Sequence, residues 1–179
     1  DFLKYLTSRY IFKSYHKYFA IETAISFENI DILMFEFKTL KYLPIDKRQE
    51  YLDLILESPK LKKNEELLFY MISNNPDINF HSMFCAHLYD DDLKIIAHIC
   101  KTVKVKIDFS MMAIESDHLE ALMITLPHDI KDDRLVQWAI HWEGFECFKY
   151  LCTQQANLIM DITTLEPHHK DYLRSIGML

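Results

Sequence analysis

The sequence is poor in the residues that build sharp turns. Only two glycines, Gly144 and Gly177, and five prolines occur in 179 residues. Because glycine is the residue that most readily adopts positive φ, we expect few tight turns of that kind, which disfavours a hairpin-rich β fold. Leu, Ile, Met, Lys and Glu are plentiful instead, and these residues favour helices.

Long apolar runs are also absent. No stretch reaches the roughly 18 apolar residues of a membrane-spanning helix, and no signal peptide is recognisable, so we expect no membrane insertion. The formal net charge of −7 disfavours nucleic acid as the partner. The chain starts at Asp1 rather than Met, which suggests a fragment from which any N-terminal targeting signal would be lost.

Cysteine is scarce and lacks metal-binding or redox spacing. The four cysteines contain no C-x-x-C pair, which indicates buried, reduced thiols in a cytoplasmic protein. The histidines and cysteines between His81 and Cys100 lack the usual zinc spacing. Gly-rich phosphate loops, G-x-S-x-G and HExxH are missing as well. We therefore predict no cofactor, no metal and no enzymatic activity. A thiol enzyme is the less favoured alternative. Its Cys–His pair would be formed by Cys147 with His141, or by Cys85 with His118.

What the sequence does contain is a repeated pattern of two short helices. An Ala-Ile pair is followed by a polar turn, an acidic residue seven positions after the Ala, and an apolar helix. This pattern aligns without a gap in three copies, which begin at Ala24, Ala113 and Ala139. The last copy turns at Glu143–Gly144 and then places Phe148, Leu151 and Cys152 on one helix face.

Further units complete the pattern. A fourth copy beginning at Ala86 fits with a one-residue insertion, and its Asp90–Asp92 run reads as a turn with an N-cap. The gap before it contains two helical patterns over residues 46–58 and 64–73, with Asp46 and Asn64 as predicted N-caps. A helix pair cannot bury its apolar face alone, but stacked pairs share a continuous core. We therefore predict an all-α solenoid of about five antiparallel helix pairs.

These units form a single domain over residues 1–179. We expect a leading helix in 1–15, the repeats over 16–157, and a C-terminal cap over 158–179 with a helix from about Pro167 to Ser175. Aromatic residues crowd the first twenty positions: Tyr5, Tyr10, Phe12, Tyr15, Tyr18 and Phe19. They either packed on a preceding repeat that is missing from a fragment, which we favour slightly, or form a partner or dimer contact.

The repeats resemble ankyrin repeats. Asp117, His118, Leu119 and Glu120 match the central part of the ankyrin unit, and Asp108 stands where a cap would replace the missing Thr-Pro-Leu-His opening. Gly144, Glu146, Lys149–Leu151 and Ala156–Asn157 match its turn, second helix and end. The hairpin glycines are missing, so the hairpins are expected to be degenerate or absent. Such divergent repeats are similar to those of African swine fever virus multigene-family proteins and of Legionella effectors. A generic helical solenoid without ankyrin ancestry remains an alternative.

The resemblance implies a non-catalytic protein-binding module, with a host protein as partner in the host cytoplasm. The alternative is a scaffold domain of a larger effector enzyme. The binding surface would be a concave face formed by the first helices and their turns. Trp138 or Trp142 could serve there as an exposed anchor. The full set of predicted binding residues is Tyr89, Asp91, Glu115, Asp117, His118, Trp138, His141 and Trp142.

Overall fold

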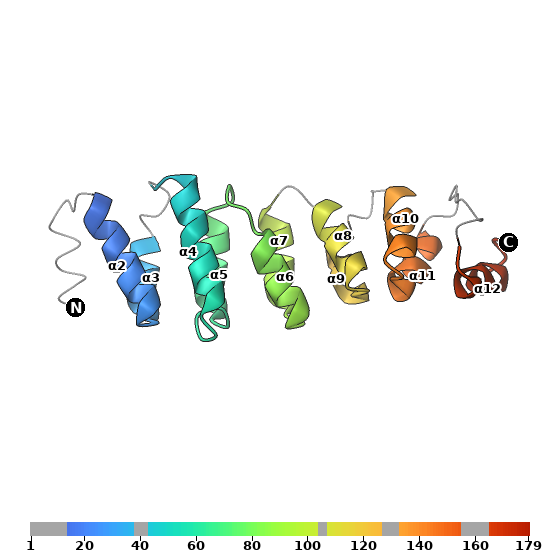
Figure 1. Ribbon diagram of the computed structural model, residues 1–179, viewed down its shortest axis with the longest axis horizontal. Helices are drawn as coiled ribbons and strands as arrows, with labels where there is room; N and C mark the ends of the chain where they lie inside the picture. Colours follow the sequence, from blue (N-terminus) through green and yellow to red (C-terminus); the bar gives the residue numbers. More distant parts are fainter. Residues whose placement is uncertain (1–13, 38–42, 104–106, 127–132, 155–164) are drawn as a thin grey trace.

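The protein is all-helical across the residues that the structure describes. This computed structural model describes residues 14–37, 43–103, 107–126, 133–154 and 165–179 and contains no strand within them (Figure 1). None of these helices has the length and apolar character needed to cross a bilayer. The helices are α2 (Ser14–Ser26), α3 (Ile30–Phe37), α4 (Ile45–Glu57), α5 (Glu65–Asn74), α6 (His81–Tyr89), α7 (Leu93–Thr102), α8 (Ile107–Glu115), α9 (Leu119–Thr125), α10 (Asp133–His141), α11 (Phe145–Gln154) and α12 (Pro167–Ser175).

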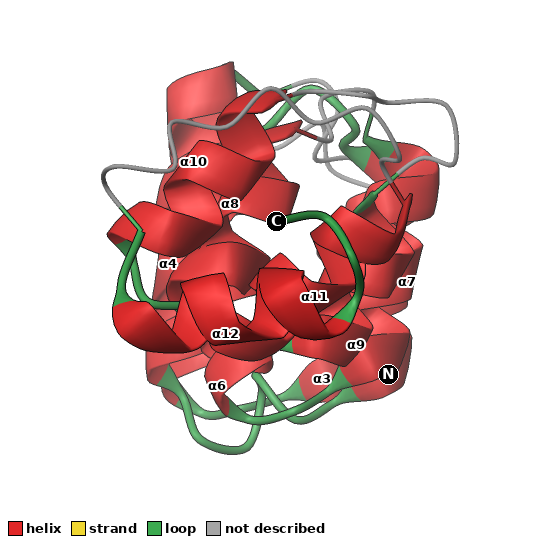
Figure 2. Ribbon diagram, turned by 90° about the vertical axis from the view of Figure 1, so that its right-hand side faces the viewer, coloured by secondary structure: helices red, strands yellow, loops and turns green. Residues whose placement is uncertain are grey.

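The helices lie in two rows along one long axis. In one row α2 contacts α4, α4 contacts α6, α6 contacts α8, and α8 contacts α10. The second row runs in the same way through α3, α5, α7, α9 and α11. Within the units, α2 packs on α3, α6 on α7, α8 on α9 and α10 on α11. Figure 2, viewed along the axis, separates the two rows.

The core lies between the rows. The second helices α5, α7 and α11 each bury residues at i, i+1, i+4 and i+5, as in Ile95, Ile96, Ile99 and Cys100 of α7. In α11 the predicted face is confirmed, because Phe148, Leu151 and Cys152 are all buried. The repeated alanines, Ala24, Ala113 and Ala139, are at most 2% exposed, so a small residue lets the helices approach closely at each position.

Local signals explain most helix ends. The Asn64 side chain accepts a hydrogen bond from the Leu67 N–H at 2.8 Å, and the Asp92 side chain does the same for Ile95 at 3.4 Å, so both predicted N-caps are confirmed. Pro167 occupies the first turn of α12, where its missing N–H costs nothing. The predicted cap at Asp46 is wrong. Pro44 is the N-cap of α4, and Asp46 lies in the first turn.

Two other expectations change with the structure. Asp108 lies inside the first turn of α8 rather than before it. The predicted leading helix within residues 1–15 falls almost entirely outside the described residues, as do Tyr5, Tyr10 and Phe12. The side chain of Tyr15 is also outside them. Of the remaining N-terminal aromatics, Tyr18 packs against the core and Phe19 is exposed.

A half-buried ion pair ties α4 to the segment that leads into α6. Arg48 is only 7% exposed, and its guanidinium donates to Asp77 at 2.6 Å and to the side-chain oxygen of Asn75 at 3.3 Å. This pair lowers the pKa of the Asp77 carboxyl, because the hydrogen bond from Arg48 favours its charged form. The connection between the second and third helix pairs is thus fixed by charge as well as by packing.

Candidate functional site

The first and second helices of four units are joined by short turns of the same construction, and these turns lie along one side of the molecule (lower edge in Figure 1). We call this surface the turn edge and define it as residues 26–29, 89–92, 115–118 and 141–144. Seven of the eight predicted binding residues belong to it. The eighth, Trp138, lies one helical turn earlier in α10.

Each turn ends its first helix by the same pair of backbone hydrogen bonds. In the α8–α9 turn, the Asp117 N–H donates to the Ile114 carbonyl at 2.9 Å and the His118 N–H donates to the Ala113 carbonyl at 2.8 Å. This is the Schellman arrangement, in which the first residue beyond the helix adopts a left-handed conformation. That residue is acidic in all four turns: Glu28 (φ 49°), Asp91 (φ 56°), Asp117 (φ 45°) and Glu143 (φ 56°).

The turns correct two expectations from the sequence. Scarcity of glycine does not prevent positive-φ turns, because Asp and Glu take that conformation here at a cost of about 1–2 kcal/mol each. The register of the Ala86 copy is also wrong. The Asp92 N–H donates to the His87 carbonyl at 2.9 Å, so His87 stands where Ala24, Ala113 and Ala139 stand, and no insertion is needed. The sequence alignment chose Ala86 because it matched residue identity, whereas the structurally equivalent residue is His87.

The residue after each acidic position begins the second helix, and three of the four cap it with a side chain. Asn29 accepts from the Ile32 N–H at 3.1 Å, Asp92 caps α7, and the His118 Nδ1 accepts from the Ala121 N–H at 3.4 Å. Because Nδ1 of His118 is an acceptor, its proton lies on Nε2, which donates to Asp91 at 3.1 Å. Gly144, the fourth of these residues, has no side chain to offer.

Polar contacts join successive turns along the edge. The Ser58 hydroxyl donates to Glu28 at 2.6 Å, and Lys62 pairs with Asp90 at 3.0 Å. The Asp91–His118 bond then connects the α6–α7 turn to the α8–α9 turn. Each link crosses from one helix pair to the next, so the edge is tied together through its whole length in the described structure.

The last link replaces the cap that Gly144 lacks. Asp117 accepts hydrogen bonds from the backbone N–H groups of Cys147 at 3.0 Å and Glu146 at 3.3 Å, so the turn of one unit caps the second helix of the next. A Cβ on Gly144 would lie 2.7 Å from the Ile114 carbonyl oxygen and 3.4 Å from Asp117. Glycine is therefore required where the two units approach.

Three aromatic side chains project from the turn edge. Phe27 is 79% exposed, Tyr89 83% and Trp142 48%. Exposed aromatic side chains of this size indicate a binding surface, because Trp and Tyr are enriched among the residues that dominate binding energy. Phe27 is not among the eight predicted binding residues, although residues 26–29 were expected to lie on the binding face. The ungapped repeat alignment also places Phe27 at the same position as Trp142, three residues after Ala24 and Ala139.

The two tryptophans of α10 have different environments. Trp138 packs against the core and lines a largely apolar pocket between α8 and α10, together with Met111 and Leu135. Trp142 projects outward, with His141 edge-on to its ring at a centroid distance of 5.5 Å. Trp142 is therefore the exposed member of the predicted pair, and Trp138 is a half-buried contact behind it.

The turn edge is acidic, especially toward its C-terminal half. Lys60 and Lys62 neutralise Glu28 and Asp90 near its N-terminal half. No Lys or Arg within the described ranges pairs with Glu115, Asp117 or Glu143, and Asp91 has His118 as its partner. The part of the edge around Trp142 thus holds carboxylates that pair with no Lys or Arg of the described residues, whereas the turn that carries Tyr89 has Lys62 beside it.

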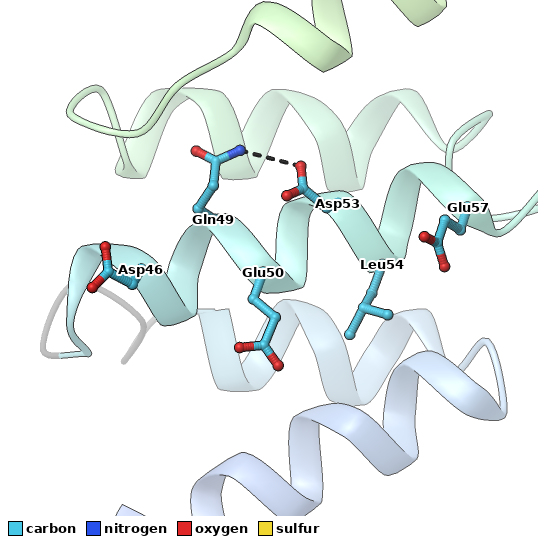
Figure 3. Close-up of a pocket in the computed structure, with 6 residues that line it drawn as sticks. All are labelled: Asp46, Gln49, Glu50, Asp53, Leu54 and Glu57. Carbon is cyan, nitrogen blue, oxygen red and sulfur yellow. Dashed lines mark hydrogen bonds between the residues drawn. The ribbon is translucent and has the colours of Figure 1, made fainter.

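A second acidic surface lies on α4. Figure 3 shows a shallow hollow lined by one face of this helix, in which the Gln49 side chain donates to Asp53 at 3.2 Å. Lys47 pairs with Glu50 beside it. The remaining lining residues are Asp46, Leu54 and Glu57. These charges follow a single helix face at helical spacing, as expected of a solvated surface.

The cysteines that were weighed as catalytic thiols and the histidines that were weighed as metal ligands lie away from the turn edge or are buried in the core. Burial raises the pKa of the Cys152 thiol to about 11 and also raises that of Cys147, with the Asp117 carboxylate adding to the effect. His98 contacts Ser73 at 2.9 Å rather than a thiol. Across the described residues, no three His, Cys, Asp or Glu side chains form a group that could hold a metal ion.

Comparisons with protein-family models, with curated proteins and with solved structures give no match for this chain.

Proposed function

We propose that the chain is a non-catalytic protein-binding module, with the turn edge as its binding surface. The architecture that we propose for it is a solenoid of ankyrin-like antiparallel helix pairs. Two features support this architecture. Each row of helices advances through contacts between neighbours, and the same backbone turn recurs at four of the five junctions between first and second helices. Repeat architectures present extended surfaces of this kind to other proteins.

The observation that carries the proposal is the exposure of Phe27, Tyr89 and Trp142 on a single edge. They belong to the first, third and fifth helix pairs, so an extended partner lying along the edge would contact all three. A partner that covered these rings would bury apolar surface worth about 25 cal/mol per Å². Hot-spot residues of an interface are typically such aromatics, set among weaker polar contacts.

Charge defines the chemistry of the partner. Because the carboxylates of Glu115, Asp117 and Glu143 lack cations in the described structure, a partner segment with Lys or Arg side chains complements the C-terminal half of the edge. Arg side chains could also stack on the exposed rings of Tyr89 and Trp142. The resemblance to viral and bacterial repeat proteins is the support for a host protein as that partner, in the host cytoplasm.

The test compares two triple variants that remove equal numbers of exposed apolar side chains. The edge variant carries Phe27→Ser, Tyr89→Ser and Trp142→Ser. The matched control carries Phe19→Ser, Met123→Ser and Ile176→Ser, which are exposed residues away from the edge. We expect partners captured by the wild-type protein to bind the edge variant about 30-fold more weakly or worse, because one lost hot spot is worth about 2 kcal/mol.

The affinity of the captured partner is then measured by calorimetry at two salt concentrations, after circular dichroism has established that both variants are folded. Binding that weakens with salt in the wild-type protein supports a basic partner. Equal binding by the edge variant and the wild type, or loss of binding in the control variant alone, would contradict the assignment of the edge.

A further inference from the structure

Among the described residues, the helix α12 packs on α11 through an aromatic seam. Its residues Tyr172 and His169 lie against the rings of Phe145 and Phe148 of α11, with centroid distances between 4.5 and 6.2 Å. Leu173 is fully buried beside them. Among the described residues, one hydrogen bond joins α12 to another element, from the Tyr172 hydroxyl to the Lys149 carbonyl at 3.4 Å.

His169 lies at the centre of this seam with no polar partner. Its side chain is 0% exposed, and within the described structure neither Nδ1 nor Nε2 has a hydrogen-bond partner. Its ring centroid lies 4.5 Å from that of Phe148 and 4.1 Å from that of His168. A neutral imidazole tolerates such a site at a moderate cost, whereas an imidazolium there would lose its hydration without gaining a hydrogen-bond acceptor.

The charged groups around this seam do not compensate for a proton on His169. His168 precedes it on the same helix, and on the α11 side Lys149 lies over the Phe145 ring at 5.0 Å. Glu166 and Glu143 are the nearby anions, and their attraction is smaller than the opposing effect of burial. The pKa of His169 is accordingly lowered from its ordinary value of 6.5, with burial as the largest cause and His168 as the next.

We infer that α12 is a pH-releasable cover over the aromatic face of α11, which stays in place while His169 is neutral and whose release is coupled to protonation of His169. A helix of nine residues is marginal on its own and depends on its packing. Once α12 leaves the seam, His169 is hydrated and takes up a proton at its ordinary pKa. Acid therefore favours the released state, and release exposes Phe145 and Phe148.

The direction of the pH dependence follows from linkage. Because the attached state binds the proton more weakly than the released state, attachment is fully stable above pH 6.5 and weakens as the pH falls below it. One proton is taken up on release. The opening constant of α12 should therefore rise by up to about tenfold for each pH unit below 6.5, until the attached state itself is protonated.

Hydrogen exchange of the intact protein tests this inference. Exchange of peptides from α12 and from α7 is measured at about pH 7.5 and about pH 5.5 and corrected for the intrinsic rate. We expect α12 to lose protection in acid while α7 keeps it. In His169→Phe, which retains an aromatic ring and cannot titrate, α12 should open equally at both pH values. The matched control His168→Gln should keep the pH dependence.

A second measurement applies even if His169→Phe fails to hold α12 in place. An NMR titration of the His169 ring protons in the wild-type protein should give a midpoint below 6.5 while α12 remains protected. A midpoint at or above the ordinary value would overturn the inference. So would an unchanged pH dependence in His169→Phe, its loss in His168→Gln, or parallel loss of protection in α7.

Discussion

Replacing two left-handed turn residues by glycine separates the backbone cost of a turn from the value of its side chain. Asp117 and Glu143 occupy the same position in successive turns, with φ values of 45° and 56°. Asp117 caps α11 by accepting from the N–H groups of Glu146 and Cys147, whereas no hydrogen bond of the Glu143 side chain occurs in the described structure. Glu143→Gly is therefore the matched control for Asp117→Gly.

The magnitudes follow from these two roles. Glycine relieves about 1–2 kcal/mol of left-handed strain, offset by about 0.4–1 kcal/mol for the greater entropy of the unfolded chain. We therefore expect Glu143→Gly to stabilise the protein by about 0.5–1 kcal/mol. Asp117→Gly gains the same amount but loses an N-cap worth about 1 kcal/mol, so its net effect should be near zero.

Thermal unfolding followed by circular dichroism measures the difference. For a chain of this length, about 1 kcal/mol corresponds to a shift of about 2–4 °C in Tm. Asp117→Asn, which keeps an acceptor oxygen and tolerates positive φ, should fall close to the wild type. Should Asp117→Gly gain as much as Glu143→Gly, the carboxylate of Asp117 would contribute nothing to α11, and the cross-unit cap would be refuted.

Two further predictions concern the approach of neighbouring units and their independence. Gly144→Ala should destabilise the protein by about 1–3 kcal/mol, because the new Cβ would lie 2.7 Å from the Ile114 carbonyl oxygen. Urea unfolding measures this loss, with Ser116→Ala as the control. An unchanged unfolding midpoint in Gly144→Ala would contradict the close contact. A chain ending at Leu126 should keep the helicity per residue of α2–α9 in circular dichroism, because each pair contacts its neighbours alone in a solenoid, whereas collapse of the helical signal would indicate a closed core.

The sequence was sufficient to predict the helices, because their signals are local. Asn64 as an N-cap, Pro167 at a helix start and the Phe148–Leu151–Cys152 face act within one or two helical turns, and the closing helix from Pro167 to Ser175 has the predicted bounds. The predictions were wrong where a neighbouring residue could serve the same structural role equally well. Pro44 competes with Asp46 at the start of α4, and His87 occupies a buried position that Ala86 was expected to fill.

The candidate site could be predicted only in part, because its contacts join residues 27–30 positions apart. The turn residues Asp91, Asp117 and His118 were identified, but the sequence does not reveal that Asp91 accepts from His118 or that Asp117 caps α11. Such contacts depend on how one helix pair sits on the next, which is a tertiary property. The exposure of Phe27 and Trp142 likewise depends on which face of each first helix its neighbours cover.

The cap that Asp117 supplies to α11 also restricts how the chain could be rearranged. Asp117 satisfies a helix that begins after glycine, and Gly144 leaves the space that the incoming carboxylate needs. A helix pair moved to another position would place its hydrogen-bond donors and acceptors against a neighbour that lacks the matching groups. The helix pairs are therefore specific to their positions and are not interchangeable. Recombining them would require the facing turns of two neighbouring pairs to be exchanged together.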